Sequence, residues 1–270
     1  MSVRWLVRLS GLLLLAVAGS AALAPAVAQK IRPARAIYDL SLGKKGAGVE
    51  LESLTGRLAL ELIETCEGAI FNQGFVTRSV QTTGEELFGD VQASLWERRD
   101  GRRFRFTQLS RSSGQEDEES RGGAELFPDG GGIARWSLPK PAEITLPRGT
   151  LFSVGYSKRV LEMAATGSRG FEVPLFDGAG EAVLYRAHAF IGKGMKPAAI
   201  SSSQPAPLPR WPIRLAYFRD DDTSGLPDYE VGFVLYGTGV INDIVIDYGE
   251  FTILGRLAAL NYHDPPSCGD

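Results

Sequence analysis

The sequence predicts a mainly β protein, built as a barrel, a sandwich or an extended curled sheet, with one substantial α-helix. Most of the chain after the first 28 residues divides into short segments in which apolar and polar side chains alternate. This period of two is typical of strands with one buried face. The segments follow one another at short, regular intervals with polar, Gly or Pro breaks, which favours antiparallel strands over βαβ units. Only one segment has helical spacing.

The first 28 residues precede this pattern and have the features of a secretory signal peptide. Arg4 and Arg8 come before the apolar run GLLLLAVAGSAALA, and the small-x-small sequence AVA at 26–28 is a cleavage site. The apolar run is shorter than the roughly 20 residues that a membrane span needs. We therefore expect residues 1–28 to be removed and residues 29–270 to contain no transmembrane segment.

The charge balance of the mature chain excludes two kinds of partner. Without the two arginines of the signal, the 29 Lys and Arg residues fall to 27 against 32 Asp and Glu residues, so the net charge is near −5. A chain of this charge has no electrostatic reason to bind nucleic acid or an anionic membrane.

The strand candidates share the alternating pattern and are bounded by turn residues. In the segment RFRFTQLSR, Phe104 and Phe106 alternate with polar side chains, and Asp100-Gly101 just before it is a strong hairpin signal. The last segment fits either two strands that meet near Gly249 or one bent strand. The candidates are 36–42, 57–65, 74–82, 91–99, 103–111, 132–138, 171–176, 182–192, 212–219, 229–236 and 241–260.

Three other segments depart from the alternating pattern. Helical spacing begins at Ser153, a plausible N-cap, and stops before Gly167, so we expect one helix over about 153–166 that packs on the sheet or plugs an open end. The charged stretch 110–123 is expected to be an exposed loop. The Pro- and Ser-rich stretch 193–210 reads as a linker between two sheet segments and could mark a domain boundary.

The chain contains two cysteines, Cys66 and Cys268. In an oxidising compartment two such thiols favour a disulfide, which would bring the two ends of the chain together. Two unpaired buried thiols, or a bond from Cys268 to another chain, are the alternatives that the sequence leaves open.

No pattern of catalytic or metal-binding residues stands out. His188 lies in a strand candidate and His263 in the polar tail, without the Cys/His cluster of a zinc site or a G-x-S-x-G nucleophile motif. The stretch RDDDTSGLPDYE at 219–230 resembles a calcium loop, but position twelve is Val231 instead of a bidentate Glu, and strand candidates flank it. We interpret it as a charged turn, and we expect no cofactor, no metal and no enzymatic activity.

An ordered set of motifs runs through nearly the whole mature chain. It consists of RAIYDLSL, TCEGAIFNQGFVTR, RFRFTQLS, LPRGTLFS, FDGAGEAVLYRAHAFIG, RWPIRLAYF, LPDYEVGFVLYGTGVINDIVIDYGEFTILGRL and a C-terminal Cys. This set resembles the EipB family of periplasmic envelope integrity proteins of Gram-negative bacteria.

The resemblance implies a single domain over residues 29–270, built as an antiparallel β-spiral whose open curled barrel is similar to those of LolA and LolB. It also implies a disulfide between Cys66 and Cys268, which we expect to close the spiral by joining its two ends, since open sheet edges are liabilities. The implied role is maintenance of the cell envelope in the periplasm, without catalysis.

Two mechanisms fit that role. In the first, the protein is a scaffold that holds another periplasmic or envelope protein; in the alternative, an apolar groove carries a lipid or a lipoprotein acyl chain. Eight aromatic side chains spread over the strand candidates and the helix could line such a groove, although the plain core is the favoured interpretation for any one of them. They are Trp96, Phe104, Phe106, Trp136, Phe152, Phe190, Trp211 and Phe218.

Overall fold

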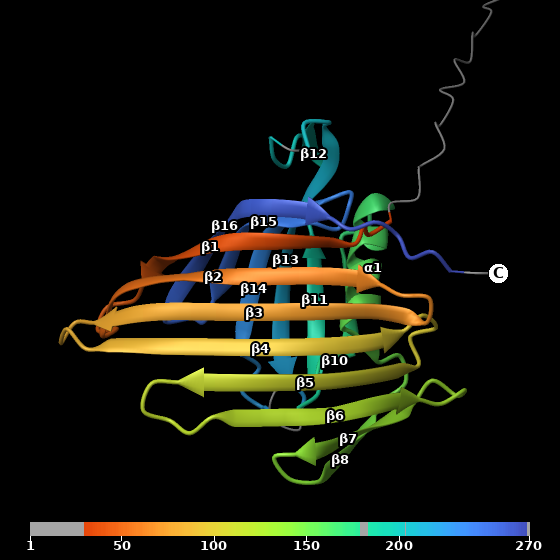
Figure 1. Ribbon diagram of the computed structural model, residues 1–270, viewed down its shortest axis with the longest axis horizontal. Coiled ribbons are helices and arrows are strands. Elements are labelled where there is room, and N and C mark those ends of the chain that lie inside the picture. Colours follow the sequence, from red (N-terminus) through yellow and green to blue (C-terminus); the bar gives the residue numbers. More distant parts are fainter. Residues whose placement is uncertain (1–29, 179–182, 203, 269–270) are drawn as a thin grey trace, which may run out of the picture.

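Alternating apolar and polar residues form sixteen strands within the part of the chain that the structure describes, and all of them belong to one sheet. The structure is a computed structural model that describes residues 30–178, 183–202 and 204–268, so the expected signal peptide lies outside it. The sheet curls until its two halves face each other, with β1–β8 on one side and β10–β15 on the other (Figure 1). It is not closed into a barrel. The predicted mainly β fold with one helix is confirmed.

The strands are mostly longer than the predicted segments. Their bounds are β1 Ala34–Lys45, β2 Leu51–Glu64, β3 Gly68–Gln81, β4 Glu86–Arg98, β5 Arg103–Ser112, β6 Glu118–Leu126, β7 Gly132–Leu138, β8 Ala142–Leu146, β9 Leu151–Phe152, β10 Gly170–Phe176, β11 Tyr185–Ile191, β12 Met195–Ala198, β13 Leu208–Arg219, β14 Tyr229–Tyr236, β15 Ile241–Asp247 and β16 Phe251–Tyr262.

The strand order places the first and last strands together in the middle of the sheet. The order is β8-β7-β6-β5-β4-β3-β2-β1-β16-β15-β14-β13-β11-β10-β9, with β12 added on β13. β1 pairs with β2 on one side and antiparallel with β16 on the other, from Ala34 opposite Tyr262 onwards. The edges are β8 and β9, which follow each other directly in the chain. Every pairing is antiparallel except that of β9 with β10.

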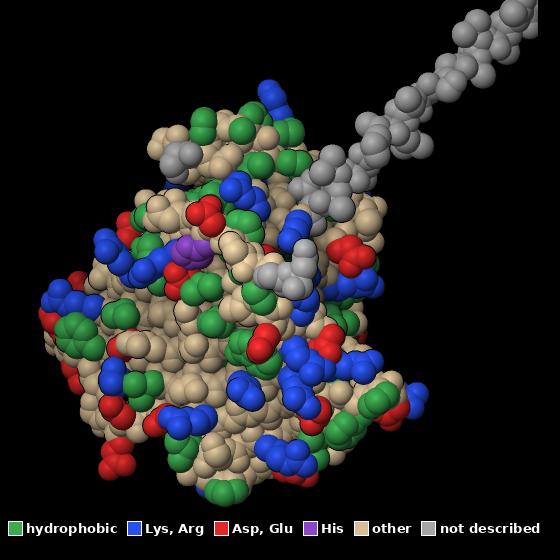
Figure 2. All heavy atoms as spheres, turned by 45° about the vertical axis from the view of Figure 1, so that its right-hand side comes forward, with side chains coloured by type: hydrophobic (Ala, Val, Ile, Leu, Met, Phe, Trp, Pro, Cys, Tyr) green, Lys and Arg blue, Asp and Glu red, His purple; other side chains and the backbone are tan. Residues whose placement is uncertain are grey.

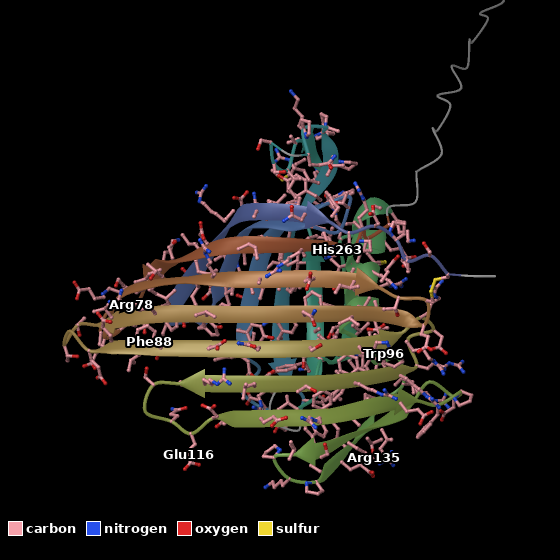
Figure 3. All side chains as sticks on the ribbon, in the orientation of Figure 1. Arg78, Phe88, Trp96, Glu116, Arg135 and His263 are labelled. Atoms are coloured by element: carbon pink, nitrogen blue, oxygen red, sulfur yellow. A yellow bond between two sulfur atoms is a disulfide. The ribbon has the colours of Figure 1, made fainter. Side chains whose placement is uncertain are left out.

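The predicted disulfide is present in the structure, but it does not join the two ends of the sheet. Cys66 in the turn between β2 and β3 is bonded to Cys268 in the tail after β16, with the two Cα atoms 5.6 Å apart. The bond lies at one end of the molecule, beside the turns of the first strands (Figure 3). Because the sheet edges are β8 and β9, the disulfide does not join them. The expected closure of the spiral by this bond is therefore wrong.

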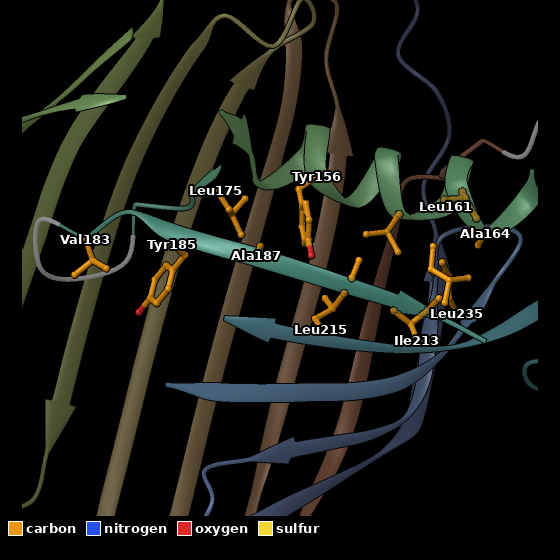
Figure 4. Packing of buried hydrophobic residues seen from close by; sticks show 13 residues of the cluster. Tyr156, Leu161, Ala164, Leu175, Val183, Tyr185, Ala187, Ile213, Leu215 and Leu235 are labelled. Carbon is orange, nitrogen blue, oxygen red and sulfur yellow. The ribbon is translucent and has the colours of Figure 1, made fainter. Parts of the chain in front are cut away.

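The helix lies inside the curl, against one end of the sheet (Figure 1). α1 spans Ser153–Ala165, close to the predicted bounds. Its apolar face packs on β10, β11, β13 and β14 (Figure 4). The buried residues of this cluster include Tyr156, Leu161, Ala164, Ala187, Leu215 and Leu235.

Two segments without the alternating pattern nevertheless belong to the sheet. The stretch 110–123, predicted as an exposed loop, instead contains the last residues of β5, a short turn and the first part of β6. Small residues make this possible, because Gly122 leaves room for the ring of Phe106, which would lie 2.5 Å from a Cβ there. The stretch 193–210 connects β11 to β13 as predicted and also contributes β12.

At 241–260 the two-strand alternative is confirmed, with Gly249 in the turn at φ +82°.

Candidate functional site

A cavity of about 600 Å³ lies between the facing halves of the sheet. This volume is within the range of roughly 300–1,000 Å³ that is usual for small-molecule sites. One wall comes from β1–β5, the opposite wall from β13–β15, and α1 contributes a third side. The walls are mainly aliphatic and aromatic, with Leu58, Leu60, Phe75, Val231, Phe233 and Ile244 as examples.

The period of two along each strand places these side chains in the cavity. On β2, the leucines at 58, 60 and 62 point inward, while Arg57 forms an outward ion pair with Asp39 at 3.2 Å. Cross-strand register then sets Leu58 opposite Phe75 and Leu62 opposite Phe71 on β3. Such apolar pairs stabilise the sheet, and here the same pairs also form a continuous apolar wall.

Helix α1 is fixed at the cavity by a carboxylate from the opposite half of the sheet. Glu97 at the end of β4 is only 5% exposed. Its side chain accepts hydrogen bonds from the N–H of Val154 at 2.8 Å and of Gly155 at 3.0 Å. These N–H groups belong to the first turn of the helix, where no side chain of the helix itself provides a cap. Ser153, the predicted N-cap, is instead the first helical residue.

Burial raises the pKa of the Glu97 carboxyl group above its ordinary value of 4.5. The bonds from Gly155 and Val154 and the nearby Lys158 act in the opposite direction, because they favour the charged form, but they do not cancel the desolvation. The free-energy cost of burying Glu97 at the helix is therefore larger when its carboxyl group is charged than when it is protonated.

Tyrosines and one carboxylate give a part of the cavity wall a polar character. Tyr217 and Tyr229 stack at 4.6 Å between ring centroids, and Asp177 and Tyr248 line the same cavity. Burial raises the pKa values of Tyr217 and Tyr229 well above 10, so both phenols are neutral at ordinary pH.

None of the eight predicted aromatics lines this cavity. Four of them, Phe104, Phe106, Trp136 and Phe152, form a separate dry core with Phe176, in which ring centroids lie 4.9 to 6.3 Å apart. The aromatic rings fill the space between the edge strands β8 and β9. The predicted lining is therefore corrected for these four.

The other four predicted aromatics lie outside the cavity as well. Trp96 alternates outward on β4, with the guanidinium of Arg105 5.4 Å from its ring. Phe190 is 54% exposed on β11, Phe218 packs on His188 at 4.9 Å, and Trp211 packs beside the cluster under α1. The signal that could have found the cavity is the aliphatic alternation of β1, β2, β14 and β15, which also forms ordinary cores.

The two histidines and the calcium-like turn do not meet at a site. The Nε2 atom of His263 is 3.1 Å from Glu61 and that of His188 is 3.0 Å from Glu172, and neither histidine lines the cavity. In the turn between β13 and β14, Asp222 is hydrogen-bonded to Ser224. No group of three or more metal-binding side chains occurs among the residues that the structure describes.

The outer surface is mixed in charge. Lys, Arg, Asp and Glu side chains alternate over the face seen in Figure 2, and hydrophobic side chains lie between them, with a small gathering on the protruding β12 segment. Within the described ranges, no helix is both long enough and apolar enough to span a membrane.

A curled antiparallel sheet that holds one helix and an apolar cavity defines the class of this protein. A family described as EipB-like matches residues 25–264, so the chain belongs to the EipB-like family. It is 31% identical over 256 residues to the cell envelope integrity protein EipB of Brucella abortus (strain 2308), covering 92% of this chain and 89% of that protein.

The fold has a solved counterpart. A crystal structure described as a beta-barrel-like protein of a domain of unknown function, DUF1849, from Brucella abortus superimposes with a TM-score of 0.79 at 30% identity. The match covers 88% of this chain and 100% of that one. The resemblance to the EipB family is thus confirmed.

Proposed function

We propose that this protein helps to maintain the cell envelope from the periplasm, without catalysis, by holding an acyl chain in its cavity. The Brucella relative supports the envelope role by its name, cell envelope integrity protein. The single observation that supports acyl binding is the cavity of about 600 Å³ with predominantly apolar walls.

The walls suit a flexible hydrocarbon better than a compact polar metabolite. Side chains from five strands of one half and four of the other line the cavity, so a long ligand can lie along it. Each methylene transferred from water into such a site contributes about 0.8 kcal/mol. Part of this gain is offset by the loss of ligand freedom on binding, but a chain of ordinary lipid length still binds.

Binding is tested on protein taken gently from the periplasm. We expect organic extraction and native mass spectrometry to release acyl-containing species, and a fluorescent fatty acid to bind the emptied protein at micromolar concentration. The signal must come from the probe, because none of Trp96, Trp136 and Trp211 lines the cavity.

A matched pair of variants separates the cavity from the surface. Ala93 on β4 lines the cavity, whereas its neighbour Gln92 is exposed on the outer face. We expect Ala93→Phe to fill the cavity and weaken probe binding at least tenfold, while Gln92→Phe leaves binding unchanged. If no lipid is extracted and the probe does not bind, acyl binding is rejected, and a protein scaffold that acts through its outer surface is the remaining mechanism.

A further inference from the structure

The cavity wall contains two buried hydroxyl groups that have nothing to bind. Tyr156 is 4% exposed, and its hydroxyl has no hydrogen-bond partner among the described residues. The same is true of the buried Oγ atom of Ser153. Both residues belong to α1 and line the cavity. Since they are three residues apart in a helix, their side chains are neighbours on one face.

Two other hydroxyls that line the cavity do have partners. Tyr38 donates to the backbone carbonyl of Ile241 at 2.9 Å, and Ser157 donates to the carbonyl of Ser153 at 2.9 Å. A buried hydroxyl without a partner costs free energy, so such groups are usually satisfied. Two adjacent exceptions that line one cavity indicate a partner that enters the cavity from outside.

The chemistry of the pair selects a neutral acceptor. Burial raises the pKa of Tyr156 well above 10, so the phenol keeps its proton and donates. Arg32 and Asp177 are the charged side chains among the described lining residues. Arg32 is exposed, with its guanidinium 4.0 Å above the ring of Tyr262. A carboxylate buried at the hydroxyls would therefore lack a committed counter-charge.

We propose that Tyr156 and Ser153 form a subsite for the carbonyl oxygen of an acyl ester, with the two hydroxyls donating to it and the hydrocarbon lying along the apolar walls. This inference rests on the proposed acyl binding and adds the chemistry of the ligand. Helix α1 then binds the ester group of the ligand, while side chains of the sheet contact its hydrocarbon chain.

The test compares an ester with a hydrocarbon of similar length. A neutral solvatochromic dye bound in the emptied protein is displaced by methyl laurate or by tetradecane. In the wild type we expect the ester to bind more tightly than the alkane. In Tyr156→Phe combined with Ser153→Ala, ester binding should weaken about tenfold, as expected for lost hydrogen bonds in a dry site, while alkane binding changes less than twofold.

Two control variants remove hydroxyls that already have partners. Ser157→Ala and Tyr38→Phe should leave the preference for the ester unchanged, although Tyr38→Phe should lower the melting temperature because it breaks a bond to Ile241. Tyr156→Phe should not lower the melting temperature of the empty protein, since the hydroxyl that it removes is unsatisfied. A purely structural hydroxyl would give the opposite result.

The outcomes distinguish the two proposals. If the ester has no advantage in the wild type, or keeps it in the double variant, the hydroxyls bind only water and the subsite is rejected while acyl binding stands. If neither compound displaces the dye, acyl binding itself fails and the subsite fails with it. Mass spectrometry after incubation with a diacyl phospholipid or a lipidated peptide then identifies which source brings the ester.

Discussion

Glu97 performs a task that sequence rules assign to a residue next to the helix. The residue before α1 is Phe152, whose extended backbone ends β9, so Ser153 is already helical and cannot cap. The orphan N–H groups are satisfied instead by a carboxylate from β4, more than fifty residues earlier. No local sequence pattern predicts such a cap, because β4 reaches the helix only through the curl of the sheet.

Replacing Glu97 tests how firmly the helix is anchored. Glu97→Ala leaves the N–H groups of Val154 and Gly155 without their acceptor, and we expect the free energy of unfolding to fall by about 1–3 kcal/mol. Glu97→Gln keeps one acceptor and should lose less. Chemical denaturation followed by circular dichroism measures both, and equal losses in the two variants would contradict a role as an acceptor.

The raised pKa of Glu97 also predicts a pH dependence. A carboxyl group with a raised folded-state pKa contributes stability that is fully present below the unfolded value near 4.5 and is lost as pH rises through the folded value. The stability of the wild type relative to Glu97→Gln should therefore decrease as the pH rises from the unfolded value near 4.5 through the raised folded value. Melting curves of the two proteins across this range provide the check, and parallel pH profiles would refute the assignment.

Among the elements, the aromatic core near the sheet edges is expected to be sensitive to truncation. Phe176 is fully buried, and its ring centroid lies 5.4 Å from that of Trp136 and 5.8 Å from those of Phe104 and Phe106. We expect Phe176→Ala to lower the free energy of unfolding by about 3–5 kcal/mol. Phe190→Ala, at an exposed phenylalanine on the next strand, should cost less than about 0.5 kcal/mol. Similar losses from both would show that the core is not packed as described.

The turn between β13 and β14 should not respond to calcium. Its carboxylates are engaged locally, Asp221 with Arg219 at 3.1 Å and Asp222 with Ser224, and Val231 at the twelfth position belongs to β14. Millimolar calcium is expected to leave the melting temperature unchanged in the wild type and in Asp220→Ala. A rise at sub-millimolar calcium that disappears in Asp220→Ala would overturn this prediction.

Among the elements, the sequence was informative for most strands that bury one face, although β8 was missed. The alternation of Phe104 and Phe106 predicted β5, and Asp100-Gly101 predicted the turn before it, with Gly101 at φ +68°. β6 was missed because it buries Ser120 and Ala124 in place of large apolar residues. Its conformation follows from its two neighbours, β5 and β7, and not from its own side chains.

At the scale of the whole molecule, the disulfide constrains the chain without closing the sheet. Its two cysteines are 202 residues apart. The chain-entropy model gives about 5 kcal/mol for a loop of this length. Cys66→Ser should lower the free energy of unfolding by up to that amount, and the double variant with Cys268→Ser should lose no more than the single one. A single variant as stable as the oxidised wild type would contradict this view.

The cavity is the feature that the sequence could not reveal. Leu62 on β2 and Val91 on β4 have the same alternating pattern as the core residues Leu40 and Ile253, yet the first two line the cavity and the others face packed neighbours. Whether an inward-facing side chain lines the cavity or packs in the core depends on the distance between the two halves of the curled sheet. That distance is a property of sixteen strands together.

The pairing of β1 with β16 also has a consequence for synthesis. β1 is the first of these strands to leave the ribosome, and its partner β16 follows roughly 200 residues later, on the order of 10–40 s at 5–20 residues per second. During that interval the twelve residues of β1 present an unpaired edge, which is a template for wrong partners. We therefore expect an incomplete chain to need shielding of β1, for example by a chaperone, until its last strand arrives.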